Sequence, residues 1–500
     1  MLKIIERVCL IMAFGCLAVF TARGNNLRLS RQVLLEQDSV ERRMSVGFDL
    51  NWENSWRNIT NYDAAWVFIK FRAAGSNEWQ HGYLVDEDVH VVPGGRVERG
   101  LSTVGEEERV VGVFISSASA LSGSANYSNV RLVWDYGASG YEWAQGTPVE
   151  VSVHAMEMVY VAEGAFYLGS GGTESGSFTD GAWSSGASIP YLVESEAVIT
   201  IAAEPGALWG RSDSGNNSIG TAGELPAAFP KGYASFYCMK YPLTEAQHVA
   251  FLNHLTAAQA ELHHSGMAGS YGNTVQLVEG GYVTEAPDRA CGYLSWADGA
   301  AYLDWSGLRP ITETEFEKAG RGGELPVPNE CAWGDTTATY QTGFDGIPGS
   351  GSETAVPVKA NLVRQSTLGS LTRVGIFATA ESDRIAAGAS YWGIMELSSH
   401  PVLLMVSVGR TRGRVFVGSH GDGELSVAGY GTNSDWPGYN ATTEVISGGD
   451  GAGFRGADFN NPNNLRPQIS NRNNASYATS GSTRFAHYGV RGVRSAPVAD

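Results

Sequence analysis

The sequence predicts an α+β protein in which an N-terminal antiparallel β-sandwich precedes an irregular domain with few helices. Three observations predict this fold class. Apolar and polar residues alternate in several short runs before residue 156, helix-start motifs occur only after residue 240, and 63 glycines favour turns over long helices. A chain of 500 residues exceeds one ordinary core, so we expect more than one domain.

Residues 1–24 have the pattern of a signal peptide. Lys3 and Arg7 give a positive start, an apolar run follows at 8–20, and Ala22-Arg23-Gly24 is a small-x-small cleavage site. The run is short for a membrane span. Cys16 would allow a lipoprotein site, but the apolar run continues past it, so cleavage without lipidation is favoured. We expect an exported protein that is periplasmic, on the cell surface or extracellular.

Residues 30–155 are predicted to form the β-sandwich. The clearest period-two runs lie at 44–52, 130–136 and 149–153, where every second residue is apolar. Clusters of Gly, Asn and Ser separate the runs, as expected for the turns of an antiparallel sandwich. The region is rich in tryptophan. These side chains could bind sugar rings or a partner, but packing in the core is the favoured interpretation.

Residues 157–496 are predicted to form the second domain. Residues 170–232 are rich in Gly, Ser and Asn and are expected to be a long decorated loop with one strand near 198–201. Helices then follow, each opened by the spacing of a capping box, in which two side chains satisfy backbone N–H groups at the helix start. The three motifs are Thr244 with Gln247, Ser295 with Asp298, and Thr312 with Glu315. Gly307 and Gly322 are placed to end the last two helices.

The charge of the chain excludes some partners. The net charge is −18 with only 34 basic residues, whereas nucleic-acid binding needs a basic surface. The same balance disfavours anionic membranes, and solubility alone is its simplest explanation. No later stretch is apolar enough to cross a bilayer, so we expect no transmembrane segment in the mature chain.

The cysteines predict no metal cluster. Signal-peptide cleavage would remove Cys9 and Cys16 and leave Cys238, Cys291 and Cys331. Three cysteines allow at most one internal disulfide, and their scattered spacing fits no zinc pattern. Small buried hydrophobes, with or without one bridge, are the favoured interpretation.

Several motifs in the second domain occur in a recognisable order. They are the signature Leu308–Gly323, Trp333-Gly334-Asp335, Phe236–Thr244, Gly393–Ser398, Gly453–Gly456 and Tyr488–Arg494. Together they resemble the formylglycine-generating enzyme family, also called the sulfatase-modifying factor family, over roughly residues 157–496. The resemblance implies a variant of the C-type lectin fold, which has little regular secondary structure.

The resemblance also implies an activity, the oxidation of a sulfatase cysteine to formylglycine by oxygen and copper(I). In the family two cysteines after the Gly453–Gly456 strand hold the copper, and in this sequence their places fall near Asn461 and Arg466. Copper(I) is soft and selects thiolates, whereas an amide is a hard donor and a guanidinium has no lone pair to offer. No cysteine follows Cys331. We therefore expect no copper site and no catalytic residues of the family type.

The calcium site of the family is also not expected. Its loop asparagine and glutamate correspond to His400 and Leu403 here, and calcium prefers carboxylate and carbonyl oxygens. A different candidate is the glycine-rich loop that places His420, Asp422 and Glu424 at alternate positions. These residues could bind a ligand, either a sugar or a metal, although a solvated turn is the favoured interpretation.

Two functions are compatible with these residues. The favoured one is an exported, non-catalytic binding or assembly module for a glycan or an extracellular protein, with the β-sandwich as a spacer or second contact surface. The alternative is an oxidoreductase of the formylglycine-generating type, because the signature helix is preserved. The sequence contains no P-loop, dinucleotide fingerprint or Gly-x-Ser-x-Gly elbow.

Overall fold

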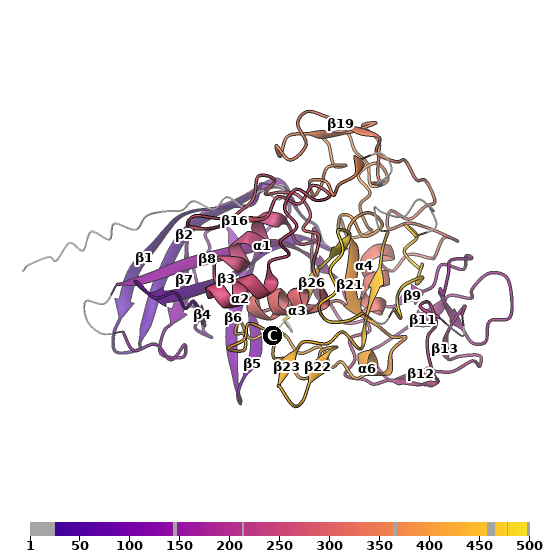
Figure 1. Cartoon of the computed structure of the whole chain (residues 1–500), viewed down its shortest axis with the longest axis horizontal. Coiled ribbons are helices and arrows are strands. Elements are labelled where there is room, and N and C mark those ends of the chain that lie inside the picture. Colours follow the sequence, from indigo (N-terminus) through magenta and orange to yellow (C-terminus); the bar gives the residue numbers. More distant parts are fainter. Residues whose placement is uncertain are drawn as a thin grey trace, which may run out of the picture.

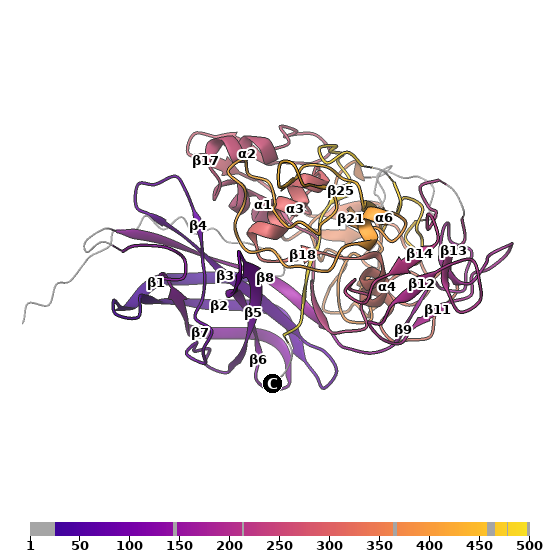
Figure 2. The same cartoon turned by 90° about the horizontal axis from the view of Figure 1, so that it is seen from below.

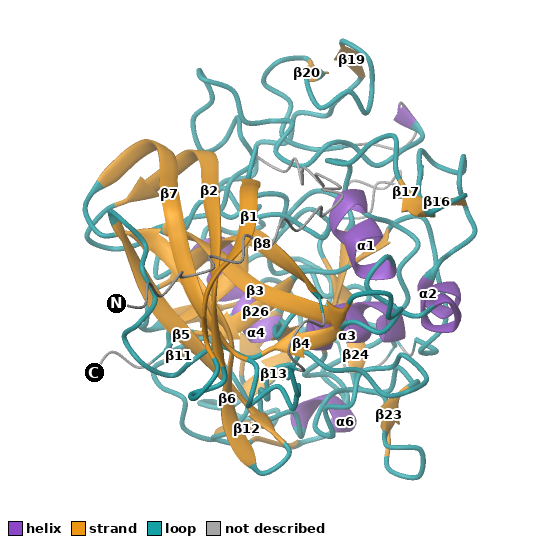
Figure 3. Ribbon diagram, turned by 90° about the vertical axis from the view of Figure 1, so that its left-hand side faces the viewer, coloured by secondary structure: helices purple, strands orange, loops and turns teal. Residues whose placement is uncertain are grey.

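The structure is a computed structural model that describes residues 26–143, 148–212, 215–363, 368–457, 466–477 and 479–497. The expected signal peptide lies outside the described residues. Strands and loops make up most of the described chain, and the helices are few and short (Figure 3). The protein is therefore β-rich, as the sequence predicts. Among the described helices, none has the length and apolarity that a membrane crossing requires.

The N-terminal strands form a three-stranded antiparallel sheet in the order β1-β2-β7. Its strands are β1 (Arg28–Asp38), β2 (Arg43–Arg57) and β7 (Leu121–Asp135). The predicted alternation appears in β2, where Val46, Phe48 and Leu50 are buried. Their side chains face an apolar core that also holds Trp52 and Trp134, so these two tryptophans pack internally as expected.

A longer sheet has the order β18-β26-β15-β8-β3-β6-β5, with β4 (Gln80–Gly82) beside β3 (Figure 1). Its strands are β18 (Arg309–Pro310), β26 (Gly492–Ser495), β15 (Phe236–Met239), β8 (Val149–Val161), β3 (Asp63–Ala73), β6 (Glu107–Ser117) and β5 (Gly95–Val104). Strand β8 runs through the expected domain boundary at 155–157 and pairs with β3 on one side and β15 on the other. The division into 30–155 and 157–496 stays a prediction, and one continuous sheet joins the two parts.

The three-stranded sheet and the N-terminal strands of the long sheet curve around a common core (Figure 2). Leu84 bridges to Val110 in β6 and to Trp134 in β7, so the two sheets are joined along one edge. This join produces a half-barrel instead of two separate layers. A bridge between residues so distant in sequence leaves no local pattern, which is why the alternation alone predicts a plain sandwich.

The described helices are α1 (Glu245–Leu252), α2 (Ala257–His263), α3 (Trp296–Trp305), α4 (Glu313–Arg321) and the short α6 (Thr411–Arg414). All three predicted capping boxes are present. A fourth, at Thr256 and Gln259, opens α2 and was not predicted. Gly307 and Gly322 follow α3 and α4 with φ of +72° and +70°, which confirms both predicted helix ends.

The region 170–232 contains more structure than the predicted loop with one strand. A four-stranded sheet of order β10-β13-β12-β14 lies within it, and β9 pairs with β11 beside this sheet. These strands are β9 (Phe166–Leu168), β10 (Phe178–Asp180), β11 (Tyr191–Val193), β12 (Ile199–Ile201), β13 (Leu208–Gly210) and β14 (Gly223–Leu225). Three-residue strands are too short to give a readable period, and only β12 was predicted.

The remaining strands form three two-stranded ribbons and one three-stranded sheet within the described residues. They are β16 (Gln276–Val278) with β17 (Gly281–Val283), β19 (Gly343–Asp345) with β20 (Thr354–Val356), β22 (Tyr439–Asn440) with β23 (Val445–Ile446), and β21 (Val402–Val406) between β24 (Ala452–Arg455) and β25 (Tyr488–Gly489). The motifs at 453–456 and 488–494 therefore fall on strands, and β26 pairs with β15 and β18.

Candidate functional site

The signature segment forms a buried structural unit at the start of α4. Arg309 in β18 donates to both carboxylate oxygens of Glu315, at 2.9 and 2.7 Å. Glu315 also accepts from the backbone N–H of Thr312, whose hydroxyl accepts from the N–H of Glu315 in return. Arg309, Thr312 and Glu315 are each at most 1% exposed. The preserved motif thus fixes the angle at which the helix leaves the sheet.

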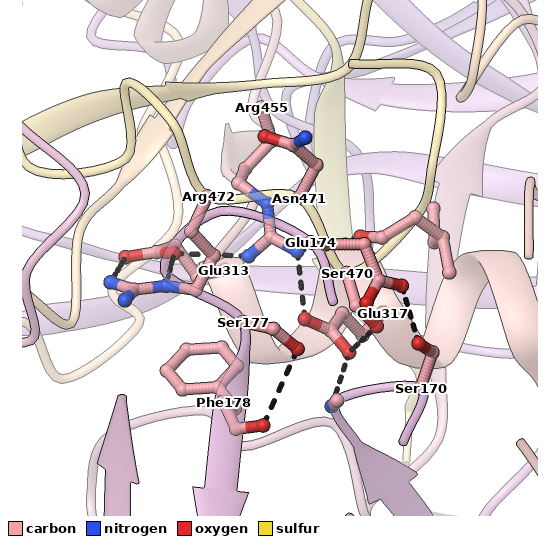
Figure 4. Close-up of polar contacts among 12 residues, drawn as sticks. Ser170, Glu174, Ser177, Phe178, Glu313, Glu317, Arg455, Ser470, Asn471 and Arg472 are labelled. Carbon is pink, nitrogen blue, oxygen red and sulfur yellow. Dashed lines mark hydrogen bonds and ion pairs between the residues drawn. The ribbon is translucent and has the colours of Figure 1, made fainter. Parts of the chain in front are cut away.

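Two carboxylates one turn apart on α4 bind arginines from the C-terminal segments (Figure 4). Arg455 donates to Glu313 at 3.0 Å and to Glu317 at 2.7 Å. Arg472 donates to Glu313 at 2.7 Å through Nε. Burial alone would raise the pKa of Glu313, but Arg472 and Arg455 outweigh it and the net pKa is lowered. Glu313 is therefore an ion-paired carboxylate inside the protein.

The same network continues along the helix. Arg321 forms ion pairs with Glu317 and Glu330 and donates to Ser470 Oγ at 2.7 Å. Glu317 also accepts from Ser470 Oγ at 2.9 Å and from the N–H of Gly169 at 2.7 Å. Buried ion pairs of this kind are costly to break. We therefore assign the charged face of α4 to the scaffold. The i, i+4 spacing of Glu313, Glu317 and Arg321 indicates this charged face, and the sequence analysis missed that signal.

The three cysteines of the expected mature chain are separate, buried thiols. All three are free, so the possible single disulfide is not formed. Cys238, Cys291 and Cys331 belong to three different apolar clusters. Burial raises the pKa of Cys238 to about 12 and raises those of the other two as well. The favoured interpretation of these cysteines as small buried hydrophobes is confirmed.

The residues after β24 do not provide the donors that copper(I) needs. Asn461 lies outside the described residues. Arg466 opens the described stretch 466–477 and is partly buried. No cysteine follows Cys331 in the sequence, so no thiolate is available in this segment. Because copper(I) binding of the family type requires two thiolates, the donor set present here does not fit it.

His400, which corresponds to the calcium-loop asparagine of the family, makes contacts within the protein. His400 is 1% exposed, and its Nε2 accepts from the N–H of Thr372 at 3.2 Å. Its Nδ1 lies 3.0 Å from Ser399 Oγ. Burial lowers the pKa of His400 to about 3, so the ring is neutral. Leu403 packs in an apolar cluster. Within the described ranges, no group of three or more His, Cys, Asp or Glu side chains could hold a metal ion.

Glu396 is a buried acid that the sequence analysis did not single out. It lies in the motif at 393–398 with φ of +61° and is 2% exposed. One oxygen accepts from the N–H of Gly375, and the other has no hydrogen-bond partner in the described part of the chain. Burial raises the pKa of Glu396 to about 7, although the Gly375 N–H, Arg491 and Arg373 oppose this shift.

The loop with His420, Asp422 and Glu424 packs against the N-terminal strands. Glu424 accepts from the N–H of His81 at 2.7 Å, and Lys70 in β3 donates to the carbonyl of Gly423 at 2.5 Å. Asp304 at the end of α3 accepts from the N–H of Asp422 at 3.1 Å. The loop is thus an internal contact between the two parts of the chain.

The electrostatics of this contact follow from burial. Burial raises the pKa of Asp304, Asp422 and Glu424, and it lowers the pKa of Lys70 to about 7 against the pull of these carboxylates. His420 points to a different place, where its Nε2 accepts from the N–H of Ser495 at 3.1 Å. The three predicted side chains therefore do not converge on one point, and their assignment as ligand-binding residues stays a prediction.

Comparison with known proteins agrees with the signature segment. Residues 145–375 match the family model described as "Sulfatase-modifying factor enzyme 1-like domain", and the chain therefore carries a sulfatase-modifying factor domain over these residues. A curated relative, the "Formylglycine-generating enzyme" of Thermomonospora curvata, is 34% identical over 84 residues. The match covers 14% of this chain and 28% of the relative.

A solved structure titled "Major Tropism Determinant U1 Variant" aligns with 85% of this chain and 82% of its own. The sequence identity is 13% and the TM-score is 0.23, so this similarity carries no argument about fold or function.

Proposed function

We propose that this protein is an exported, non-catalytic binding or assembly module, built on a sulfatase-modifying factor scaffold, for a glycan or an extracellular protein. One observation carries the proposal. The described cysteines lie in three separate apolar clusters, and the places where the family holds copper have Asn461 and Arg466 in this sequence.

The family reaction needs a pair of thiolates at one point. A thiol whose pKa burial has raised to about 12, as for Cys238, stays protonated at neutral pH. Three such thiols in separate clusters cannot act together as ligands of one ion. The scaffold is then available for recognition, because loops on a rigid frame are the usual place for binding.

The alternative is an oxidoreductase that converts a protein cysteine to formylglycine. The preserved signature segment favours it, since Arg309, Thr312 and Glu315 are in place. Each of these residues is used to hold α4, however, and a fold does not by itself establish an activity. The binding module is therefore the stronger proposal.

The N-terminal strands have a supporting role in this proposal. We place a β-sandwich-like unit at residues 30–155 as a spacer or second contact surface. Its strands β3, β5 and β6 share the long sheet with β15 and β26, which would hold it at a fixed angle to the scaffold. Residues 1–24 would direct export.

An activity assay tests the proposal against the alternative. The purified chain is incubated with copper(I), oxygen and a cysteine-containing sulfatase peptide, and the peptide is analysed by mass spectrometry. The T. curvata formylglycine-generating enzyme serves as the positive control. We expect the control to produce formylglycine and this protein to leave the cysteine unchanged. Product formed in more than one turnover by this chain would overturn the proposal.

A further inference from the structure

An open groove lies where three C-terminal segments meet, at 438–441, 447–450 and 479–482, beside Arg412. Its volume is about 740 Å³. Strand β22, which is in the lower part of Figure 1, and the segment that follows β23 line one side of it. The groove is remote in sequence from the signature helix and contains none of the residues of the buried ion network.

Glycines among the lining residues let the three segments of this groove approach one another closely. A Cβ at Gly438 would lie 2.3 Å from the carbonyl oxygen of Gly448, and one at Gly449 would lie 2.6 Å from that of Thr479. A Cβ at Gly481 would lie 2.0 Å from the carbonyl oxygen of Ser447. The three segments therefore pack backbone against backbone, and a side chain at any of these glycines would force them apart.

The groove is lined by polar side chains with few internal partners. The guanidinium of Arg412 makes one hydrogen bond, at 3.3 Å to the carbonyl of Ser434. Among the described residues, the carboxylate of Asp450 and the hydroxyl of Tyr439 have no hydrogen-bond partner, and Asp450 is exposed. Tyr439 is half-buried and packs on the edge of the main core, which holds its ring in place.

These groups define the chemistry of a ligand. A cation and an anion on the same groove give no net charge locally, and together they offer donors and acceptors to neighbouring hydroxyl groups. An aromatic ring held in place can pack on the apolar face of a sugar ring. The net charge of −18 opposes a polyanionic ligand. We propose that this groove binds a neutral oligosaccharide, an inference that rests on the proposed binding function.

Calorimetric titration of the full chain tests the inference. The probes are the neutral hexasaccharides of maltose, cellulose, xylan and chitin type, with hexagalacturonate as an anionic comparison. We expect at least one neutral probe to bind. Tyr439→Ala and Asp450→Asn should each weaken that binding by about tenfold or more, as for a central contact residue. Glu444→Gln, an exposed change on the same ribbon outside the groove, should leave it unchanged.

The outcomes separate this inference from the function on which it rests. Binding that survives both groove substitutions would place the site elsewhere and overturn the inference, while the binding function would stand. Binding of hexagalacturonate alone would contradict the ligand class. If no saccharide binds at millimolar concentration, the inference is wrong, whereas the proposed function is overturned by formylglycine formation.

Discussion

Burial changes the acid–base behaviour of Glu396. Its folded-state pKa of about 7 lies above the ordinary value of 4.5 because the carboxylate is almost completely desolvated. Below pH 4.5 both the folded and the unfolded states hold the proton, so the full contribution to stability is present. Between pH 4.5 and 7 the folded state retains a proton that the unfolded chain has lost, so stability falls across this window and is fully lost above pH 7.

We therefore predict that Glu396→Gln makes the protein more stable at pH 8 than the wild type, by up to about 3 kcal/mol. Below pH 4.5 the two proteins should differ little. Denaturant unfolding between pH 4 and 8 measures the difference. A difference that does not grow with pH would show that the carboxyl ionises freely in the folded protein.

The arginines around Glu313 are a second feature at this scale. Glu313, Arg455 and Arg472 have fully buried side chains. Removing the Glu313 carboxylate would leave the buried guanidinium groups of Arg455 and Arg472 without this shared partner. We predict that Glu313→Ala destabilises the fold by roughly 3–5 kcal/mol.

A matched control is Glu150→Ala. Glu150 pairs with Arg72 at 2.6 Å, but its side chain is 46% exposed. Its loss should cost less than about 1 kcal/mol, because solvent screens exposed pairs. Urea unfolding of both variants gives the comparison. Equal effects would argue against a structural role for the buried network.

At the scale of elements, the loop at 420–424 holds the second part of the chain against the N-terminal strands. Gly423 has φ of +91°, and a Cβ there would lie 2.1 Å from Nδ1 of His81. We predict that Gly423→Ala costs clearly more than Gly94→Ala. Gly94 has φ of +77° with no atom within 4 Å of its Cβ, so it isolates the cost of the backbone conformation.

The Gly94 variant should lose about 1–2 kcal/mol, and the Gly423 variant should lose a further 1–3 kcal/mol, roughly, from overpacking. The stabilities are compared by thermal and denaturant unfolding. Equal losses in the free energy of unfolding would mean that the loop can shift to accommodate the added Cβ and contributes little to the contact.

Structural features that depend on residues close together in the sequence could be predicted. Contacts between residues far apart in the sequence could not. The capping boxes at Thr244, Ser295 and Thr312 are local, so their spacing was sufficient. The pairing of Glu313 with Arg472 joins residues far apart in the chain, and no period marks it. The absence of cysteine after Cys331 is read directly from the sequence, and the lack of a copper site stays a prediction. The groove could not be predicted, since its lining residues come from three separate segments.

At the scale of the whole molecule, one sheet joins the N-terminal strands to β15, β26 and β18. Strand β8 cannot leave either neighbour without exposing backbone groups that are otherwise paired. We predict a single cooperative unfolding transition. Tryptophan fluorescence, which reports on both parts of the chain because tryptophans occur before and after residue 156, and far-ultraviolet circular dichroism should give the same midpoint. Two separate transitions would show that the parts unfold independently.

The central claim is that this scaffold lacks a copper(I) site. The most direct measurement is a copper(I) titration of the full chain in competition with a chromophoric bidentate chelator, with Cys9 and Cys16 replaced by serine. The account predicts that the chelator keeps all the copper and that the absorption of its complex is unchanged by the protein. Transfer of one equivalent of copper(I) to the protein, lost again on substitution of Cys238, Cys291 or Cys331, would contradict it.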